Sequence, residues 1–272
     1  FLSGGIGVLS AANGVSTTLT ATTAGSGQIT ADHATLLDDA TGAITVTAGT
    51  LAYIKIVAGP SGDGAEFTST TLTTDDALTL HAAGYDASDN YLGDQSVIWT
   101  GTDGLAGIIS GSGTSITFNP NLAPNSGTIV ADHATATDDA TGLITINVGA
   151  EHHVKILSDA SGETSEIGSA GLVTGNTLTV HAASFDADNN YVQDVSVNWA
   201  LSGGIGTLSE TSSISTILTA TTAGTGQITA DHATLLDDAT GTITVTAGAL
   251  DYIKIVAGLS GDGAEFDAAT LT

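Results

Sequence analysis

HAAGYDASDNYLGDQSVIW at 81–99 returns as HAASFDADNNYVQDVSVNW at 181–199, and this pair of stretches decides the fold. Each joins an apolar run, a turn rich in Asp and Asn, and a second run that ends in Trp. A spacing close to 100 residues also separates LAYIKIVAG at 51–59, EHHVKILSD at 151–159 and LDYIKIVAG at 250–258. A repeat of this length can bury a core of its own, so the sequence predicts a string of autonomous modules.

The repeat divides the chain into four parts. They are the C-terminal half of a domain at 1–49, complete domains at 50–149 and 150–248, and the N-terminal strands of a further domain at 249–272. The first part matches 200–248, and the last matches the start of the second part. Half-built sheets expose unpaired strand edges, so we expect the chain to be a segment of a longer array.

Short alternating runs of apolar and polar residues, broken by Gly, Asp and Ser, fill each repeat and are typical of an antiparallel sandwich. In the first complete repeat the predicted strands cover 53–57, 77–85, 96–99, 108–109, 116–118, 128–133 and 143–147. No segment shows the period of a helix. Seven strands in about 100 residues predict an all-β fold of tandem immunoglobulin-like β-sandwich domains arranged end to end.

The buried face can be read from the alternation within two of these strands. Leu80 and Ala82 point to one side of the second strand. Val97 and Trp99 share a face of the third strand, and Trp199 holds the matching place in the next repeat. A Trp at this position is a feature of immunoglobulin cores. We therefore expect both tryptophans at the centres of their modules.

These stretches resemble bacterial immunoglobulin-like (Big) tandem repeats, the modules strung along invasin-like and other large bacterial surface adhesins. The likeness lies in the order of strand, Asp-rich turn with Asn, and Val-Trp strand at 81–99 and 181–199. It also lies in TTAGSGQITADHA at 22–34, followed by AITVTAG at 43–49. It covers nearly the whole chain. The resemblance implies an extracellular, cell-surface location and a structural role in cell adhesion.

The charge of the chain excludes several classes of partner. There are 29 acidic residues against three lysines and no arginine, which gives a net charge of −26. Such a chain has no basic surface for nucleic acid or anionic lipid. No apolar run reaches the roughly 18 residues of a membrane span, which predicts no membrane insertion in this segment. Cysteine is absent, so disulfides cannot reinforce the modules.

The acidic turns are the candidate cation sites, because Asp and Asn recur there at alternating or near-alternating positions and Ca²⁺ prefers such oxygen ligands. In an immunoglobulin sandwich, the loop between the second and third strands and the loop between the last two strands lie at the same end. The loop after the first strand of the preceding unit is expected to project toward the same junction. The predicted ligands are Asp86, Asn90, Asp94, Asp138, Asp139, Asp186, Asp188, Asn190, Asp194, Asp237 and Asp238, with Asp63 and Glu66 from the loop after the first strand.

The hypothesis is a Ca²⁺ site at or near each domain junction, which would stiffen a connection of very few residues. The alternative is turn chemistry alone, because Asp and Asn populate tight turns through hydrogen bonds to their own backbone. Neither turn has the Gly and the terminal Glu of an EF-hand loop, so that specific site is excluded. Ca²⁺ is the one cofactor that the sequence predicts.

Lys55, Lys155 and Lys254 are the only basic residues, and each stands at the same place in a first strand. One interpretation is a covalent cross-link from the lysine to an Asn or Asp of another strand. The other is a solvated edge lysine that discourages pairing with neighbouring chains. The last strand carries Asn147 in one repeat but Thr in the others, so a uniform acceptor is missing and the edge lysine is favoured.

The histidines do not predict catalysis. His33, His133 and His232 follow Asp in ADHA, but adjacent residues of a strand point to opposite faces, so the Asp cannot orient the imidazole. Phosphate-loop and nucleophile-elbow patterns are absent. The sequence therefore predicts that this segment is not an enzyme.

Taken together, the residues predict a structural segment of an extracellular fibre or adhesin stalk, a mechanical spacer whose partners are the neighbouring domains of the same chain. Two alternatives stay open. Identical chains could self-assemble into a filament, sheath or surface layer. The repeats could instead bind surface glycans, although aromatic residues are only 4% of the chain and leave Tyr91 and Tyr191 for sugar stacking.

Overall fold

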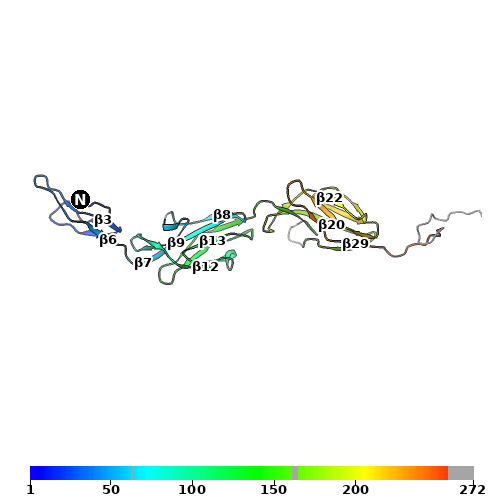
Figure 1. Cartoon of the computed structure of the whole chain (residues 1–272), viewed down its shortest axis with the longest axis horizontal. Helices are drawn as coiled ribbons and strands as arrows, with labels where there is room; N and C mark the ends of the chain where they lie inside the picture. The colour runs from blue at the N-terminus through cyan, green and yellow to red at the C-terminus, as the bar shows by residue number, and fades with distance from the viewer. Residues whose placement is uncertain (63, 161–164, 257–272) are drawn as a thin grey trace, which may run out of the picture. The chain divides into compact units, whose positions relative to one another are not determined.

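The computed structural model describes residues 1–62, 64–160 and 165–256. The chain divides into two compact units, Phe1–Ala150 and Glu151–Thr272. The described residues form strands, turns and short 3-10 segments, so the chain is all-β (Figure 1). Within that part of the chain, no helix is long and apolar enough to cross a membrane.

In the first unit, one sheet of the complete module is built around the long strand β9 (Leu78–Asp86). β7 (Leu51–Val57) runs antiparallel along one edge of β9. The other edge carries β13 (Ser115–Phe118) and β10 (Tyr91–Asp94), both antiparallel to β9. The repeated stretch at 81–99 thus supplies the central strand of this sheet, its acidic turn and a short return strand.

The facing sheet consists of two hydrogen-bonded groups of strands. One group is, in order, β12 (Ser110–Gly113), β11 (Val97–Gly101), β15 (Ile129–Asp132) and β16 (Asp139–Ala140). The other is β14 (Asn125–Gly127), β17 (Ile144–Asn147) and β8 (Thr70–Thr73). Because β14 leads into β15 and β16 leads into β17, the two groups continue each other along the module.

The N-terminal strand of the module changes sheets. Its first part, β7, is antiparallel to β9, whereas its second part, β8, is parallel to β17 in the facing sheet. The remaining ladders of the two sheets are antiparallel. Two such sheets around one core form an immunoglobulin-like β-sandwich.

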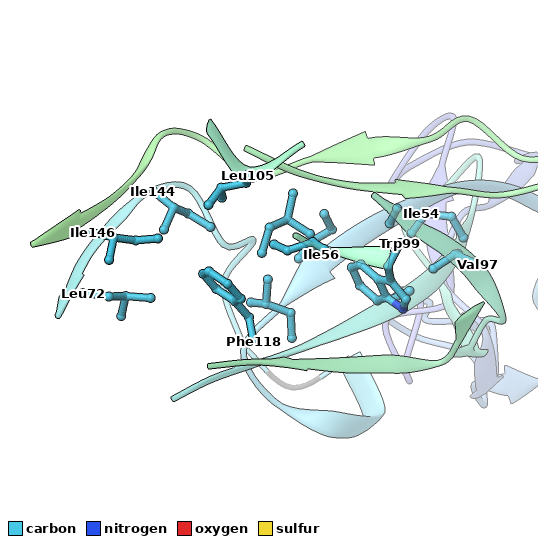
Figure 2. Close-up of a cluster of buried hydrophobic side chains, with 14 residues drawn as sticks. Ile54, Ile56, Leu72, Val97, Trp99, Leu105, Phe118, Ile144 and Ile146 are labelled. Carbon is cyan, nitrogen blue, oxygen red and sulfur yellow. The ribbon is translucent and has the colours of Figure 1, made fainter. Parts of the chain in front are cut away.

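The core lies between the two sheets (Figure 2). Trp99 is fully buried there, and its Nε1–H donates to the backbone oxygen of Gly113 at 3.1 Å. A buried indole with its N–H bonded contributes apolar area without an unpaired donor. Leu80, Ala82 and Ile144 are also fully buried. The inward face predicted from the alternation is therefore confirmed.

The second unit repeats this architecture. Its first sheet contains β18 (His153–Leu157), β20 (Thr177–Phe185), β25 (Ser215–Ala220), β23 (Gly206–Leu208) and β21 (Tyr191–Asp194). Its second sheet contains β24 (Ser212–Ser213), β22 (Val197–Leu201), β27 (Ile228–Asp231) and β28 (Asp238–Ala239), followed by β26 (Gly224–Gly226), β29 (Ile243–Thr246) and β19 (Ala170–Val173). Trp199 is 4% exposed and donates to the backbone oxygen of Ser213 at 3.0 Å. The second tryptophan thus occupies the predicted place.

The first 46 residues form pairs of short strands. They are β1 (Gly7–Leu9) with β2 (Leu19–Ala21), β3 (Gly25–Gly27) with β6 (Ile44–Val46), and β4 (Thr30–Ala31) with β5 (Asp39–Ala40). Part of their core face is open to solvent: Ala31 is exposed, although the matching Ala230 is fully buried, whereas Ile6 is fully buried. A sandwich buries its core between two sheets, so positions of this segment that have no facing strand are less covered than their counterparts in the second unit.

The predicted strand at 108–109 is wrong. Ile109 is 3% exposed, but it follows the 3-10 segment η2 (Asp103–Leu105), and its N–H donates to the backbone oxygen of Leu105 at 3.3 Å. Ile109 therefore contributes to the core from a turn, and the edge strand β12 begins only at Ser110. β8 and β10 are strands that the prediction did not include, because neither carries a clear alternation of apolar and polar residues.

Candidate functional site

An Asp and an Asn four residues apart organise the turn between β9 and β10. Asp86 is 4% exposed, and its Oδ1 accepts the backbone N–H groups of Ser88 and Asn90 at 2.8 and 2.9 Å. The Asn90 Nδ2 lies 3.1 and 2.9 Å from the two carboxylate oxygens. Between them, Asp89 has a φ of 65°, a left-handed conformation in which Asp is enriched. The alternating Asp and Asn residues thus build the turn itself.

The same carboxylate holds the segment that leads into the module. The Gly49 N–H donates to Asp86 Oδ2 at 2.6 Å. A Cβ on Gly49 would lie 3.3 Å from that oxygen, so a larger residue would press on the contact. The N–H of Gly49, then that of Asn90, stabilise the charged form and lower the pKa of Asp86 to about 2.

Asn90 reaches further back, to residues that precede the linker. Its Oδ1 accepts the backbone N–H of Ala24 at 2.8 Å, and its Nδ2 donates to the backbone oxygen of Thr22 at 3.1 Å. Both partners lie in the bend between β2 and β3. Together with the Gly49 contact, these hydrogen bonds join the first 49 residues to the complete module within the same unit.

The turn of the second repeat has the same internal geometry. Asp186 is fully buried and Asn190 is 7% exposed. Asp186 Oδ1 accepts the N–H groups of Asp188 and Asn190 at 3.0 and 2.8 Å, and the Asn190 Nδ2 lies 3.1 and 2.9 Å from the two oxygens. Burying a carboxylate costs stability unless hydrogen bonds compensate, and these N–H groups supply them.

The other predicted ligand loop, between the last two strands, is held by a second kind of hydrogen bond. Asp138 is exposed, and its Oδ1 accepts the N–H of His133 at 2.7 Å. Asp139 Oδ2 accepts the N–H of Ile56 on β7 at 2.6 Å. The first of these bonds closes the loop, and the second ties it to the opposite sheet.

The second unit has the same two bonds. Asp237 accepts the N–H of His232 at 2.8 Å, and Asp238 accepts the N–H of Ile156 at 2.7 Å. Burial raises the pKa of Asp238, and the Ile156 N–H opposes that rise.

The ADHA motif has a structural explanation in this loop. The His133 Nδ1 accepts the N–H of Ala136 at 3.0 Å, and the His232 Nδ1 lies 3.3 Å from the N–H of Leu235. The Nδ1 of each ring thus acts as the acceptor for a backbone N–H of the same loop. The motif therefore closes a turn, and the Asp that precedes each His takes no part in orienting the ring.

Tyr53 lies between the two predicted ligand loops of the first module. Its backbone pairs with Thr137 in the ADHA loop, and its hydroxyl donates to Asp89 in the acidic turn. The two loops therefore lie at the same end of this module. The Lys55 Nζ also donates to Asp89, at 3.1 Å.

Sequence reasoning did not single out Asp89. In the second repeat His153 and Asn189 replace Tyr53 and Asp89, and their side chains hydrogen-bond to each other. Burial is the main cause that lowers the pKa of His153, which favours its neutral form. The joint exchange of Tyr and Asp for His and Asn is the signal that could have found this contact.

Asp94 and Asp194 each accept a hydrogen bond from a tyrosine of the same short strand. The Tyr91 hydroxyl donates to Asp94 Oδ1 at 2.7 Å, and the Tyr191 hydroxyl donates to Asp194 Oδ1 at 3.1 Å. Desolvation, followed by the bond to Asp94, raises the pKa of Tyr91 to about 12. These two carboxylates therefore accept hydrogen bonds within the short edge strand that follows the acidic turn.

Glu66 was expected to project toward the following junction, and this expectation is wrong. Glu66 pairs with Val57 inside its own module, because the chain doubles back beside β7 before it enters β8. Asp63, the other predicted ligand of this loop, lies outside the described residues.

Among the described residues, no three or more His, Asp or Glu side chains gather in a way that could hold a metal ion. Four of the six buried or half-buried carboxylates of the predicted set, Asp86, Asp139, Asp186 and Asp238, each accept at least one backbone N–H. The geometry of these loops is that of hydrogen-bonded turns, and Ca²⁺ binding stays a prediction.

The lysines lie against aromatic rings at the sheet edge. The Lys55 Nζ is 4.9 Å from the centre of the Tyr85 ring, and the Lys155 Nζ is 4.9 Å from that of Phe185. Lys155 also lies 3.8 Å from Glu166 Oε2. Such cation–π contacts fix a charged amine without covalent chemistry.

We expect the intact mass of the chain to equal that of the plain sequence. Mass spectrometry of the denatured protein measures this directly. A deficit of one ammonia or one water for each lysine would contradict the edge-lysine interpretation and support the cross-link.

The depressed pKa of Asp86 predicts a pH dependence of stability. Its folded pKa of about 2 lies below the ordinary 3.8, so its contribution is present above about pH 4 and is lost as the pH falls toward 2. We expect Asp86→Asn to lower the midpoint of thermal unfolding at pH 7 and to flatten the fall between pH 4 and pH 2. Calorimetry from pH 2 to 7 measures both.

The matched control for this prediction is Asp132→Asn, which alters an exposed carboxylate of the same module. It should leave the pH profile of the parent unchanged. Parallel profiles for the parent and Asp86→Asn would show that the hydrogen bonds to Asp86 do not stabilise the folded state.

No family profile matches the chain, and no curated protein is similar to it. Among solved structures it is similar to extracellular domains 3–5 of Drosophila OTK, with 9% identity over 73% of this chain and 68% of that chain and a TM-score of 0.34. It is also similar to the Escherichia coli adhesin FdeC, with 17% identity, 76% and 68% coverage and a TM-score of 0.28. Domains 4 and 5 of the S-layer protein SbsC give 12% identity, 73% and 100% coverage and a TM-score of 0.26.

The class of the protein rests on its own strand topology. The two units contain immunoglobulin-like β-sandwich modules in tandem, each with facing sheets, a sheet-switching first strand and a central tryptophan.

Proposed function

We propose that this chain is a mechanical spacer, a segment of an extracellular fibre or adhesin stalk built from bacterial immunoglobulin-like repeats. The observation that carries the proposal is that each complete module closes its own core. Trp99 and Trp199 lie in separate clusters of buried side chains. Modules that do not share a core can pass tension along a chain and unfold one at a time.

The ends of the modules support this function. The Ala150 N–H donates to Asp75 Oδ2 at 2.7 Å, and the Gly248 N–H donates to Thr174 Oγ1 at 2.8 Å. Gly49 is held by Asp86 in the same way. The segments that enter and leave a module are thus hydrogen-bonded to it, in contrast to a flexible Gly/Ser linker. A spacer needs this stiffness to hold a binding site at a distance.

The surface chemistry fits an extracellular chain that works alone. A net charge of −26 makes identical chains repel one another, which opposes lateral bundling. The hydroxyls of Tyr91 and Tyr191, the residues available for sugar stacking, are bonded to Asp94 and Asp194. The proposal therefore assigns the partner role to neighbouring domains of the same chain.

Single-molecule force spectroscopy tests the spacer. The chain has no cysteine, so a cysteine appended at each end gives unique attachment points. We expect two separate unfolding events, one for each complete module, and each should release on the order of 300 Å of chain for about 100 residues. One event that releases both modules together would show that they are not autonomous and would overturn the proposal.

Electron microscopy and a glycan array address the two alternative functions. Lone particles at all concentrations fit a spacer, whereas ordered multi-chain bundles would replace it with a self-assembling filament or surface layer. A glycan that binds well above background would replace it with a carbohydrate-binding module.

Ca²⁺ at the module ends stays a prediction from the sequence, and calorimetry measures whether it binds. Extracellular modules bind Ca²⁺ with dissociation constants of about 0.1 to 1 mM, so a few millimolar Ca²⁺ should stabilise a real site by roughly 1 to 2 kcal/mol. The expected result is a midpoint a few degrees higher in Ca²⁺ than in chelator, with Mg²⁺ as the control for charge screening. Equal midpoints would remove Ca²⁺ and leave the spacer in place.

A further inference from the structure

We propose that Asn90, oriented by Asp86, is a docking clasp at the joint between the first 49 residues and the module that follows them, and that its partner is the backbone of the bend at 22–24. The proposal rests on the proposed function and deepens it, because it names the contact that makes the spacer stiff. The bend belongs to the part of the chain that precedes the complete module, and the clasp belongs to the module itself.

The first step of the argument is the orientation of the Asn90 amide. Its Nδ2 lies 3.1 and 2.9 Å from the two oxygens of Asp86. A carboxylate only accepts hydrogen bonds, so the reversed amide would place oxygen against oxygen. Asp86 is itself held by the N–H groups of Ser88 and Asn90. The Asn90 Oδ1 is therefore fixed in the direction of the preceding repeat.

The second step is the match between this amide and its partner. Asn90 accepts the N–H of Ala24 at 2.8 Å and donates to the carbonyl of Thr22 at 3.1 Å. The side-chain amide of Asn90 offers one donor and one acceptor. The backbone of the bend offers the matching acceptor, the Thr22 carbonyl, and the matching donor, the Ala24 N–H. Asn90 thus contacts the bend as a neighbouring β-strand would. Two bonds restrict rotation about the contact in a way that one bond does not.

The third step is the anchor on the linker. The Gly49 N–H donates to Asp86 Oδ2 at 2.6 Å, so the connection between the two parts is held by the residue that orients Asn90. The Asp86 carboxylate thus both orients Asn90 and accepts the Gly49 N–H of the linker. All three partners on the preceding side are backbone groups, and the side chains of Thr22 and Thr23 are not needed for the contact.

Distance measurements between spin labels test the clasp in the full chain. Thr45→Cys on β6 and Thr100→Cys on β11 are exposed strand positions on either side of the joint, and the sequence supplies no other cysteine. We expect a narrow distance distribution in the otherwise unchanged chain. Asn90→Ala should widen it at least twofold.

Two control variants separate the clasp from general damage to the turn. Ser88→Ala alters an exposed side chain of the same turn and keeps the N–H that Asp86 accepts, so the distribution should stay narrow. The double change Thr22→Ala and Thr23→Ala keeps the backbone of the bend, so it should also stay narrow. A wide distribution in this double variant would show that side chains make the joint, and the proposal would fail.

A second readout keeps the test decisive if Asn90→Ala perturbs its own module. Ala24→Pro removes the N–H from the other side of the contact, and the corresponding bend at 122–124 already carries a Pro at its third position. This variant should widen the distribution as Asn90→Ala does. In Asn90→Ala the exchange rate of the Ala24 amide should rise about fivefold to tenfold, the range expected for the loss of one hydrogen bond. Unchanged width and unchanged exchange, with Trp99 fluorescence still that of a folded module, would overturn the clasp.

The failure of the clasp and the failure of the spacer are distinguishable. Force spectroscopy reports whether modules unfold separately, whereas the labels report how freely the joint moves. The label experiment is repeated in chelator and in millimolar Ca²⁺. We expect the same narrow distribution in both. A distribution that widens in chelator to the level of Asn90→Ala would assign the stiffness to a cation and overturn the clasp.

Discussion

Trp99→Ala is expected to destabilise the first complete module by about 3 to 5 kcal/mol. Trp99 is fully buried between the two sheets, and the substitution removes its packing and leaves the Gly113 carbonyl without its donor. For a module of about 100 residues, this corresponds to a fall in the unfolding midpoint of more than 10 °C. Because the modules have separate cores, only one of the two transitions should move.

The two tryptophans make this result easy to read. Each complete module has one, so Trp199 is the only tryptophan left in the variant and reports on the other module alone. Its fluorescence transition should coincide with that of the parent, while calorimetry shows the early transition of the damaged module. Ile98→Ala is the matched control, because Ile98 is the neighbouring residue on the same strand and is 56% exposed. A shift of the Trp199 transition by the same amount would show that the two modules unfold as one body.

The second large effect concerns two nearly identical stretches of the chain. Residues 17–49 and 216–248 differ only at 18, 26 and 43 of the first stretch. Thr41 donates to the Ile29 carbonyl at 2.9 Å, and Thr240 donates to the Ile228 carbonyl at the same distance. The bonds match, but Ile228 is fully buried and Ile29 is only partly covered. The two stretches therefore differ in burial, whereas their sequences and these hydrogen bonds are nearly the same.

We expect amide exchange in 216–248 to be slower than in 17–49 on the order of a hundredfold or more. Protection of a core strand reaches the global free energy of unfolding, whereas an uncovered strand pair opens locally. Hydrogen exchange with mass spectrometry distinguishes the stretches in peptides that include position 18, 26 or 43, because only these peptides differ in mass from their counterparts. Equal protection would mean that the first stretch buries its apolar face against something other than the sheets described here.

The fold was predictable because the alternation reports burial directly. Leu80, Ala82, Val97 and Trp99 are buried as the period of two requires, and β7 and β9 lie within two residues of the predicted strands. The failures have a physical cause. Ile109 fills the core from a turn, so its apolar character indicated burial but not a strand.

The acidic turn was predictable in position, but its hydrogen-bond partners were not. The spacing of Asp86 and Asn90 identified the turn that contacts the preceding segment. Their partners are backbone groups of Thr22, Ala24 and Gly49, and a backbone N–H or carbonyl leaves no mark in a sequence. Carboxylates that ligate a cation and carboxylates that accept N–H groups share the same residue types, so only geometry separates them.

The division of the first strand between the two sheets determines how a module bears load. The chain enters through β7 and leaves through β17, and β8 lies parallel to β17 along four paired residues. Pulling on the two ends drags these strands lengthwise past each other, so their hydrogen bonds are loaded in shear and must break together. An antiparallel hairpin pulled from its open end would instead unzip one bond at a time. The second module has the same parallel pair, β19 with β29. In each module, the strands next to the two termini are therefore joined by a ladder that resists sliding.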